Sequence, residues 1–131
     1  MHGLRGCYIV VLLLMAALLL PGFAGAVDET DFKLESTEDL IDLATTSPDD
    51  PLYPHAINFL HGFLVGAYHY HEAMAMGPEG VRLFCPPDQV PSRNEVINEF
   101  IGWAKKHPEY WKEPAVETEF RFLMEKWPCK R

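Results

Sequence analysis

The chain has 131 residues, of which 19 are acidic and 11 basic, so its formal net charge at pH 7 is −8. Nucleic acid and anionic membrane surfaces are poor partners for so acidic a chain, whereas a basic protein surface would attract it. The length is enough for one compact domain with a modest core and too short for two.

The first 26 residues are predicted to form a cleavable secretory signal. Arg5 precedes an apolar run, Pro21 breaks the run, and small residues up to Ala26 provide a cleavage site. A transmembrane anchor is the alternative, but the run is shorter than the roughly 20 residues that span a bilayer. Cleavage after Ala26 would leave residues 27–131 as a single exported domain, one charge more negative because Arg5 is lost.

The first predicted helix covers about residues 37–44. Ser36 precedes it as an amino-terminal cap, and leucine and isoleucine recur after it at helical spacing. Residues 47–51, Ser-Pro-Asp-Asp-Pro, have the composition of a turn. We therefore expect a short helix followed by a loop.

The second predicted helix is the longest and covers about residues 55–76. Its apolar residues fall into two neighbouring stripes, so we expect two of its faces to be buried. The stripes are Phe59, Phe63, Gly66, Tyr70 and Ala73, and beside them Ile57, Leu60, Leu64, Ala67 and Met74.

Two glycines, Gly62 and Gly66, lie one turn apart on this helix. Each costs about 1 kcal/mol in helix propensity, so we expect them to permit close packing of another backbone. The alternative is that they only make room for Phe63 and Tyr70.

A proline-clamped connector follows the helix and contains Cys85. The third predicted helix, residues 92–106, begins at Ser92, with Glu95 placed to complete a capping box. Its expected buried stripe is Val96, Ile97, Phe100, Ile101 and Ala104, with Trp103 beside it.

A turn at residues 108–112 leads to a fourth predicted helix, residues 114–127, whose stripe is Val116, Phe120, Leu123 and Trp127. The third and fourth helices would each span roughly 20 Å, and the short connection predicts that they are antiparallel.

The last two cysteines, Cys85 and Cys129, stand at the outer ends of these two helices. They are the only cysteines left once Cys7 leaves with the signal, so one disulfide would close the hairpin. The expected fold is therefore an all-α single domain of four helices and one short turn, held by that disulfide.

Histidines and a carboxylate on the second helix, His61, His69, His71 and Glu72, suggest a metal site. Residues two apart on a helix point about 200° from one another, so His69 and His71 cannot chelate one ion. We expect neither a metal nor a cofactor, with metal handling kept as an alternative. We also expect no enzyme, because the cysteines are committed to a bridge and Ser36, Ser47 and Ser92 have cap or turn roles.

Five short motifs occur in a characteristic order: TEDLIDLA (37–44), LHGFLVGAYH (60–69), FCPP (84–87), WAKKHPEYWKEPA (103–115) and EKWPC (125–129). In this order they resemble the Rap/Tai family of immunity proteins associated with type VI secretion amidase effectors. The resemblance implies a small helical periplasmic protein that binds and neutralises a peptidoglycan amidase. Ala44 and Leu60 stand where the family commonly has cysteines, and Phe63 replaces its usual tyrosine, so a second bridge is lost as a unit.

The function expected from the resemblance is that of a non-enzymatic periplasmic binding protein. Its surface, expected to be acidic, would cover the active-site cleft of the amidase. The alternative is an acid-stress chaperone of the HdeA type, which is also small, helical and disulfide-bonded and would expose apolar surface at low pH. A homodimer is a further possibility.

Overall fold

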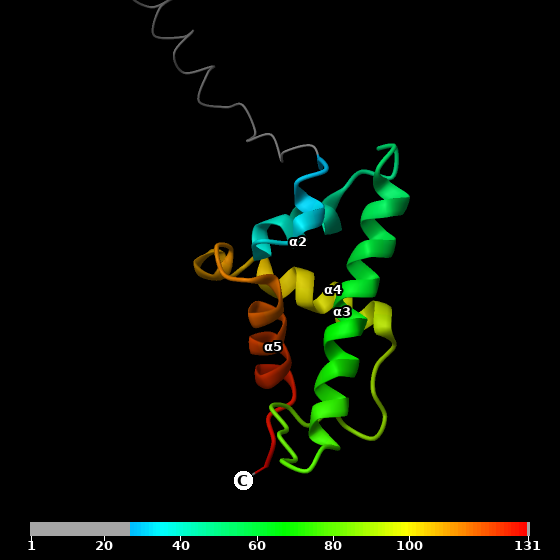
Figure 1. Ribbon diagram of the computed structural model, residues 1–131. Helices are drawn as coiled ribbons and strands as arrows, with labels where there is room; N and C mark the ends of the chain where they lie inside the picture. The colour runs from blue at the N-terminus through cyan, green and yellow to red at the C-terminus, as the bar shows by residue number, and fades with distance from the viewer. Residues whose placement is uncertain (1–26, 131) are drawn as a thin grey trace, which may run out of the picture.

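The computed structural model describes residues 27–130, which are helical throughout their regular structure (Figure 1). The predicted signal peptide lies outside the described residues. No helix in this part of the chain combines the length and hydrophobicity needed to span a bilayer. The elements in order are η1 (Asp31–Lys33), α2 (Thr37–Thr45), α3 (Tyr53–Ala75), α4 (Arg93–Ala104), η2 (Pro108–Tyr110) and α5 (Ala115–Lys126).

For residues 27–130, the prediction of an all-α fold with four helices is confirmed. Both predicted caps are present: Ser36 and Ser92 each accept a hydrogen bond from the backbone N–H three residues later, and the Asp39 and Glu95 carboxylates accept from the cap N–H groups. Helix α3 starts two residues earlier than predicted, because Pro54 lies in the first turn, where its missing N–H costs nothing.

Helix α3 is the longest element and runs the height of the molecule, with α5 beside it (Figure 1). Helix α2 lies at the upper end, and α4 runs across the molecule. The main core lies where these four helices meet, and the connector adds Phe84, which is fully buried. Its buried residues include Leu40, Leu60, Leu64, Phe100, Phe122, Leu123 and Trp127.

The predicted antiparallel arrangement of the last two helices is wrong, since α4 crosses α5 (Figure 1). The turn predicted at residues 108–112 is present as η2. The indole N–H of Trp111 also donates to the carbonyl of Ala104, 2.9 Å away. The segment is thereby held as a wide corner that redirects the chain.

The disulfide between Cys85 and Cys129 is present, with a Cα separation of 4.9 Å. It does not close the mouth of a hairpin as expected. It joins the connector after α3 to the segment after α5, at the lower end of Figure 1. The Cys85 N–H donates to the Trp127 carbonyl at 2.8 Å, so the two segments are also paired through their backbones.

One of the two stripes predicted to be buried on α3 is wrong. Phe59 is 38% and Tyr70 66% exposed, whereas Leu60 and Leu64 on the second stripe are buried. Met74, also on the second stripe, is 44% exposed because it lies near the end of α3. The other helices cover a single face of α3, which leaves the first stripe largely to solvent.

Candidate functional site

Negative charge is concentrated at one end of the molecule. Residues 27–50, which we call the acidic segment, contain nine carboxylates and a single basic residue, Lys33. Residues 51–131 contain ten acidic and nine basic residues and are almost neutral. The acidic segment forms η1, α2 and the following loop, at the upper end of Figure 1. The charge of the chain is thus strongly polarised.

The acidic segment is folded onto the rest of the domain. Val27 is buried with Leu43 and Ala56 in a small second core. The side chain of Asp28 accepts hydrogen bonds from the hydroxyl and the backbone N–H of Thr30, and these hydrogen bonds lower the pKa of Asp28. The backbone of the segment is thus attached to the domain, and the Asp28 carboxylate is held by Thr30.

Crowding of like charge is visible at Asp42. Burial raises the pKa of this carboxyl above its usual range. Repulsion from the carboxylates of Asp31, Glu38 and Asp39 raises it further. A cationic surface brought to this end would relieve the repulsion.

Contacts across the chain attach the acidic segment to the corner between α4 and α5. The hydroxyl of Thr37 donates to that of Thr118, 2.7 Å away in the interior. The Thr37 N–H also donates to the Glu113 carbonyl at 2.8 Å. On the surface, Lys112 forms an ion pair with Glu38.

An aromatic stack forms that corner and explains much of the motif at residues 103–115. The rings of Trp103 and His107 stack with centroids 4.2 Å apart, and the Tyr110 ring lies 5.7 Å from that of His107. Arg121 covers Tyr110 at 5.0 Å and donates two hydrogen bonds to Glu113. These half-buried aromatic side chains beside the acidic segment are of the kind that anchors protein partners.

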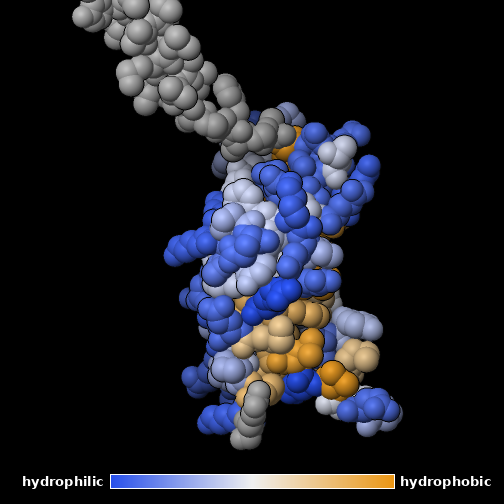
Figure 2. Space-filling view, turned by 90° about the vertical axis from the view of Figure 1, so that its left-hand side faces the viewer, coloured by the Kyte–Doolittle hydropathy of each residue, from blue (hydrophilic) through white to orange (hydrophobic). Residues whose placement is uncertain are grey.

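The opposite end of the molecule exposes several apolar side chains. Figure 2 shows hydrophobic side chains gathered on the lower half of its face, below a mainly hydrophilic upper half. At the end of α3 and in the connector, Met74, Met76, Val81 and Leu83 are all exposed.

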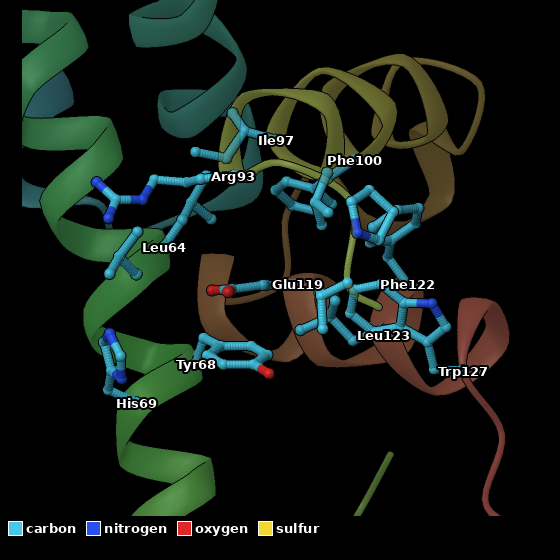
Figure 3. A pocket seen from close by; sticks show the side chains of 14 residues that line it. Leu64, Tyr68, His69, Arg93, Ile97, Phe100, Glu119, Phe122, Leu123 and Trp127 are labelled. Carbon is cyan, nitrogen blue, oxygen red and sulfur yellow. The ribbon is translucent and has the colours of Figure 1, made fainter. Parts of the chain in front are cut away.

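A cavity of about 300 Å³ lies between α3, α4 and α5 (Figure 3). Its exposed lining residues form the mouth, and its buried ones form an almost wholly apolar floor. The mouth contains His69, Val90, Pro91 and Arg93, and the floor Leu64, Ile97, Phe100, Glu119, Phe122, Leu123 and Trp127.

Glu119 is the one acidic residue in this lining. Its side chain is only 4% exposed, and Oε2 has no hydrogen-bond partner among the described residues. Burial raises the pKa of Glu119 to about 9, so the carboxyl is neutral and can donate a hydrogen bond at pH 7. Sequence reasoning missed this residue, although its position three after Val116 and four before Leu123 places it on the apolar stripe of α5.

The glycines expected to pack closely do not do so. Gly62 and Gly66 lie on the exposed face of α3. If a Cβ were added at either position, no atom of residues 27–130 would lie within 4 Å of it, apart from the neighbouring backbone of α3 itself. The prediction of close helix packing is therefore wrong within the chain.

The histidines of α3 are separated in space. His71 is buried, accepts a hydrogen bond at Nε2 from the Leu83 N–H at 2.9 Å, and stacks on Phe84 with centroids 3.9 Å apart. His69 is exposed at the cavity mouth, and His61 lines a second cavity. In the described part of the chain, no three His, Cys, Asp or Glu side chains are grouped so that they could hold a metal ion.

The second cavity, of about 350 Å³, includes both positions at which cysteines were expected from the resemblance. Ala44 and Leu60 line it together, and both belong to the main apolar core. Apolar side chains thus line this cavity at both positions where a second bridge was inferred to be lost.

In a comparison with protein families, the family model described as Rap1a immunity proteins matches residues 36–129. This range begins at the Ser36 cap and includes all four α-helices and both bridged cysteines. Neither the curated proteins nor the solved structures provide a match.

Proposed function

The chain belongs to the Rap1a immunity protein family, and we propose that it binds and neutralises a peptidoglycan amidase effector in the periplasm. An immunity role implies an effector protein as partner. The amidase, type VI delivery and the periplasmic location are the parts that we propose.

The observation that carries the proposal is the position of the acidic segment beside the aromatic stack. Nine carboxylates at one end of a chain that is otherwise nearly neutral create a field that steers a basic surface to that end. Trp103 and Tyr110 then supply rigid apolar contact area next to the charge. We propose that this end covers the active-site cleft of the amidase.

The proposed mechanism is binding without catalysis. Cys85 and Cys129 are joined and cannot act as nucleophiles. The Ser36 and Ser92 hydroxyls each accept a capping hydrogen bond. These side chains serve the fold, which is consistent with a protein that acts through its surface.

The periplasmic location is proposed from two features that are typical of exported proteins. The predicted signal peptide directs the chain out of the cytoplasm. The disulfide is of a kind that persists in an oxidising compartment. A peptidoglycan amidase acts in that same compartment.

The test uses the amidase encoded nearest to this chain, with purified peptidoglycan as substrate. We expect a stable equimolar complex by size-exclusion chromatography at pH 7 and loss of peptidoglycan cleavage at equimolar protein. Full cleavage in the presence of excess protein, together with recovery of no cell-wall hydrolase from periplasm by the immobilised chain, would contradict the proposal.

A further inference from the structure

The contacts of Glu119 do not explain why a carboxyl group is buried at this position. A buried polar atom normally has a hydrogen-bond partner, yet Oε2 has none among the described residues. An apolar side chain would suit the surrounding core better, because burying an unpaired polar group is unfavourable. The Glu119 side chain lines a cavity, so a molecule bound there can supply the missing hydrogen-bond partner (Figure 3).

The cavity has the size of a small ligand. At roughly 30 Å³ for each non-hydrogen atom, the share of a molecule in liquid water, its volume of about 300 Å³ holds about ten such atoms. Phe100, Leu123 and Trp127 give it an apolar floor, which favours an alkyl or aromatic body.

The polar groups of the cavity select the head group of the ligand. Arg93 forms no ion pair with any described residue, and its guanidinium extends toward α3, as the carboxyl of Glu119 does (Figure 3). The guanidinium and the neutral carboxyl are both hydrogen-bond donors at pH 7. Two donors and one positive charge fit an anionic acceptor, and Arg93 would repel a cation.

We propose that this cavity binds a small amphipathic monocarboxylate. Its carboxylate accepts hydrogen bonds from Arg93 and Glu119, and its alkyl chain lies on the apolar floor. A guanidinium and a carboxylate form charge-assisted hydrogen bonds, which are stronger than neutral ones. The proposal is independent of the amidase partner, because the cavity is separate from the acidic segment.

The test is a titration of the purified, disulfide-bonded protein with sodium octanoate, whose size matches the cavity, followed by NMR at pH 7. We expect saturable shifts at Ile97 and Leu123, with a dissociation constant on the order of 1 mM or tighter. Octylamine, which has a similar alkyl chain but a cationic head, should bind at least about tenfold more weakly.

Two variants separate the head-group contact from simple hydrophobic binding. Arg93→Gln should weaken octanoate binding about tenfold, through loss of one charge-assisted contact. Arg82→Gln is the matched control, because Arg82 pairs with Glu72 and does not line the cavity, and it should leave the affinity unchanged.

The pH dependence identifies the contribution of Glu119. The titratable and charged groups that line the cavity are Tyr68 and His69 from α3, Arg93 from α4 and Glu119 from α5. Burial raises the pKa of Tyr68, so Glu119 is the group that becomes anionic between pH 7 and 10. Between pH 7 and 10, the octanoate affinity of the wild type should therefore fall about tenfold or more. That of Glu119→Gln should fall by less than about twofold.

The proposal is overturned if octanoate shifts no cavity resonance, if octylamine binds as tightly, or if Arg93→Gln has no effect. A second outcome would also overturn the proposal: the free protein binds no octanoate, and in the complex with the effector a side chain of the effector fills the cavity. Circular dichroism at pH 10 verifies that the wild type and Glu119→Gln are both folded at the pH at which their octanoate affinities are compared.

Discussion

The backbone N–H of Cys85 donates a hydrogen bond to the carbonyl oxygen of Trp127, 2.8 Å away. The connector after α3 is therefore paired with the end of α5 by a hydrogen bond as well as by the disulfide to Cys129. This junction sets the lower end of the domain. The upper end carries the acidic segment.

Removal of the disulfide should destabilise the domain strongly. Cys85 and Cys129 are 44 residues apart, and a cross-link over a loop of that length stabilises by about 4 kcal/mol on the chain-entropy model. Urea unfolding of the double variant Cys85→Ala/Cys129→Ala should show a loss near this value. A loss below about 1 kcal/mol would show that the bridge is incidental to the fold.

Glu119 should make the protein more stable as the pH falls from 9 to 5. Its pKa is about 9 when folded and near 4.5 when unfolded, so the folded state binds the extra proton in this range. At pH 7 the cost of keeping the carboxyl neutral is up to about 3 kcal/mol. Glu119→Gln should therefore raise the stability by up to this amount at pH 7 and by little at pH 4.

The same urea experiment bears on the acid-chaperone alternative. A chaperone of that type requires loss of structure and exposure of apolar surface in acid. Wild-type stability that falls steadily from pH 8 to 5, with dye binding near pH 3, would contradict the stabilising contribution of Glu119 and favour the alternative.

His71 should be a stability residue. Replacing it with alanine removes the hydrogen bond from the Leu83 N–H and the stack on Phe84, at a cost of about 2–4 kcal/mol. His69→Ala is the control, because that side chain is exposed and should change stability by less than about 0.5 kcal/mol. Equal losses for the two variants, or a melting temperature that depends on added zinc, would contradict this assignment.

Gly62→Ala should stabilise the monomer. The position is exposed inside α3, and the added Cβ meets no atom within 4 Å from outside the neighbouring helix backbone. Alanine at such a site gains about 0.5–1 kcal/mol in thermal or urea unfolding, as it should at Gly66. A loss of stability that depends on protein concentration would instead show that a second copy packs closely on this face.

Local signals in the sequence predicted the helices well. The caps at Ser36 and Ser92 depend on residues within one turn, so their side chains are sufficient to locate the helix starts. Leu60 and Leu64 were correctly placed in the core because α3 buries the stripe that carries them. Counting cysteines was enough to pair Cys85 with Cys129.

Features set by distant contacts were predicted less well. The exposure of Tyr70 depends on how many helices cover α3, which periodicity does not reveal. The crossing of α4 and α5 depends on the corner in which Trp103, His107 and Tyr110 stack. Glu119 was overlooked because an acidic residue is normally solvated, and only the packing of α5 shows that it is buried.

Charge reversal in the acidic segment tests whether this end of the chain binds the proposed amidase partner. Glu29, Glu35 and Asp49 are exposed residues of the acidic segment whose side chains accept no hydrogen bond within the described structure. The triple variant to lysine should require at least about tenfold more protein than the wild type to stop peptidoglycan cleavage at pH 7.

The matched control reverses Glu79, Asp88 and Glu125, three exposed carboxylates outside that segment. This control should inhibit like the wild type, at equimolar protein. Equal inhibition by the acidic-segment variant, or no inhibition by the wild type, would show that the acidic segment does not bind the amidase.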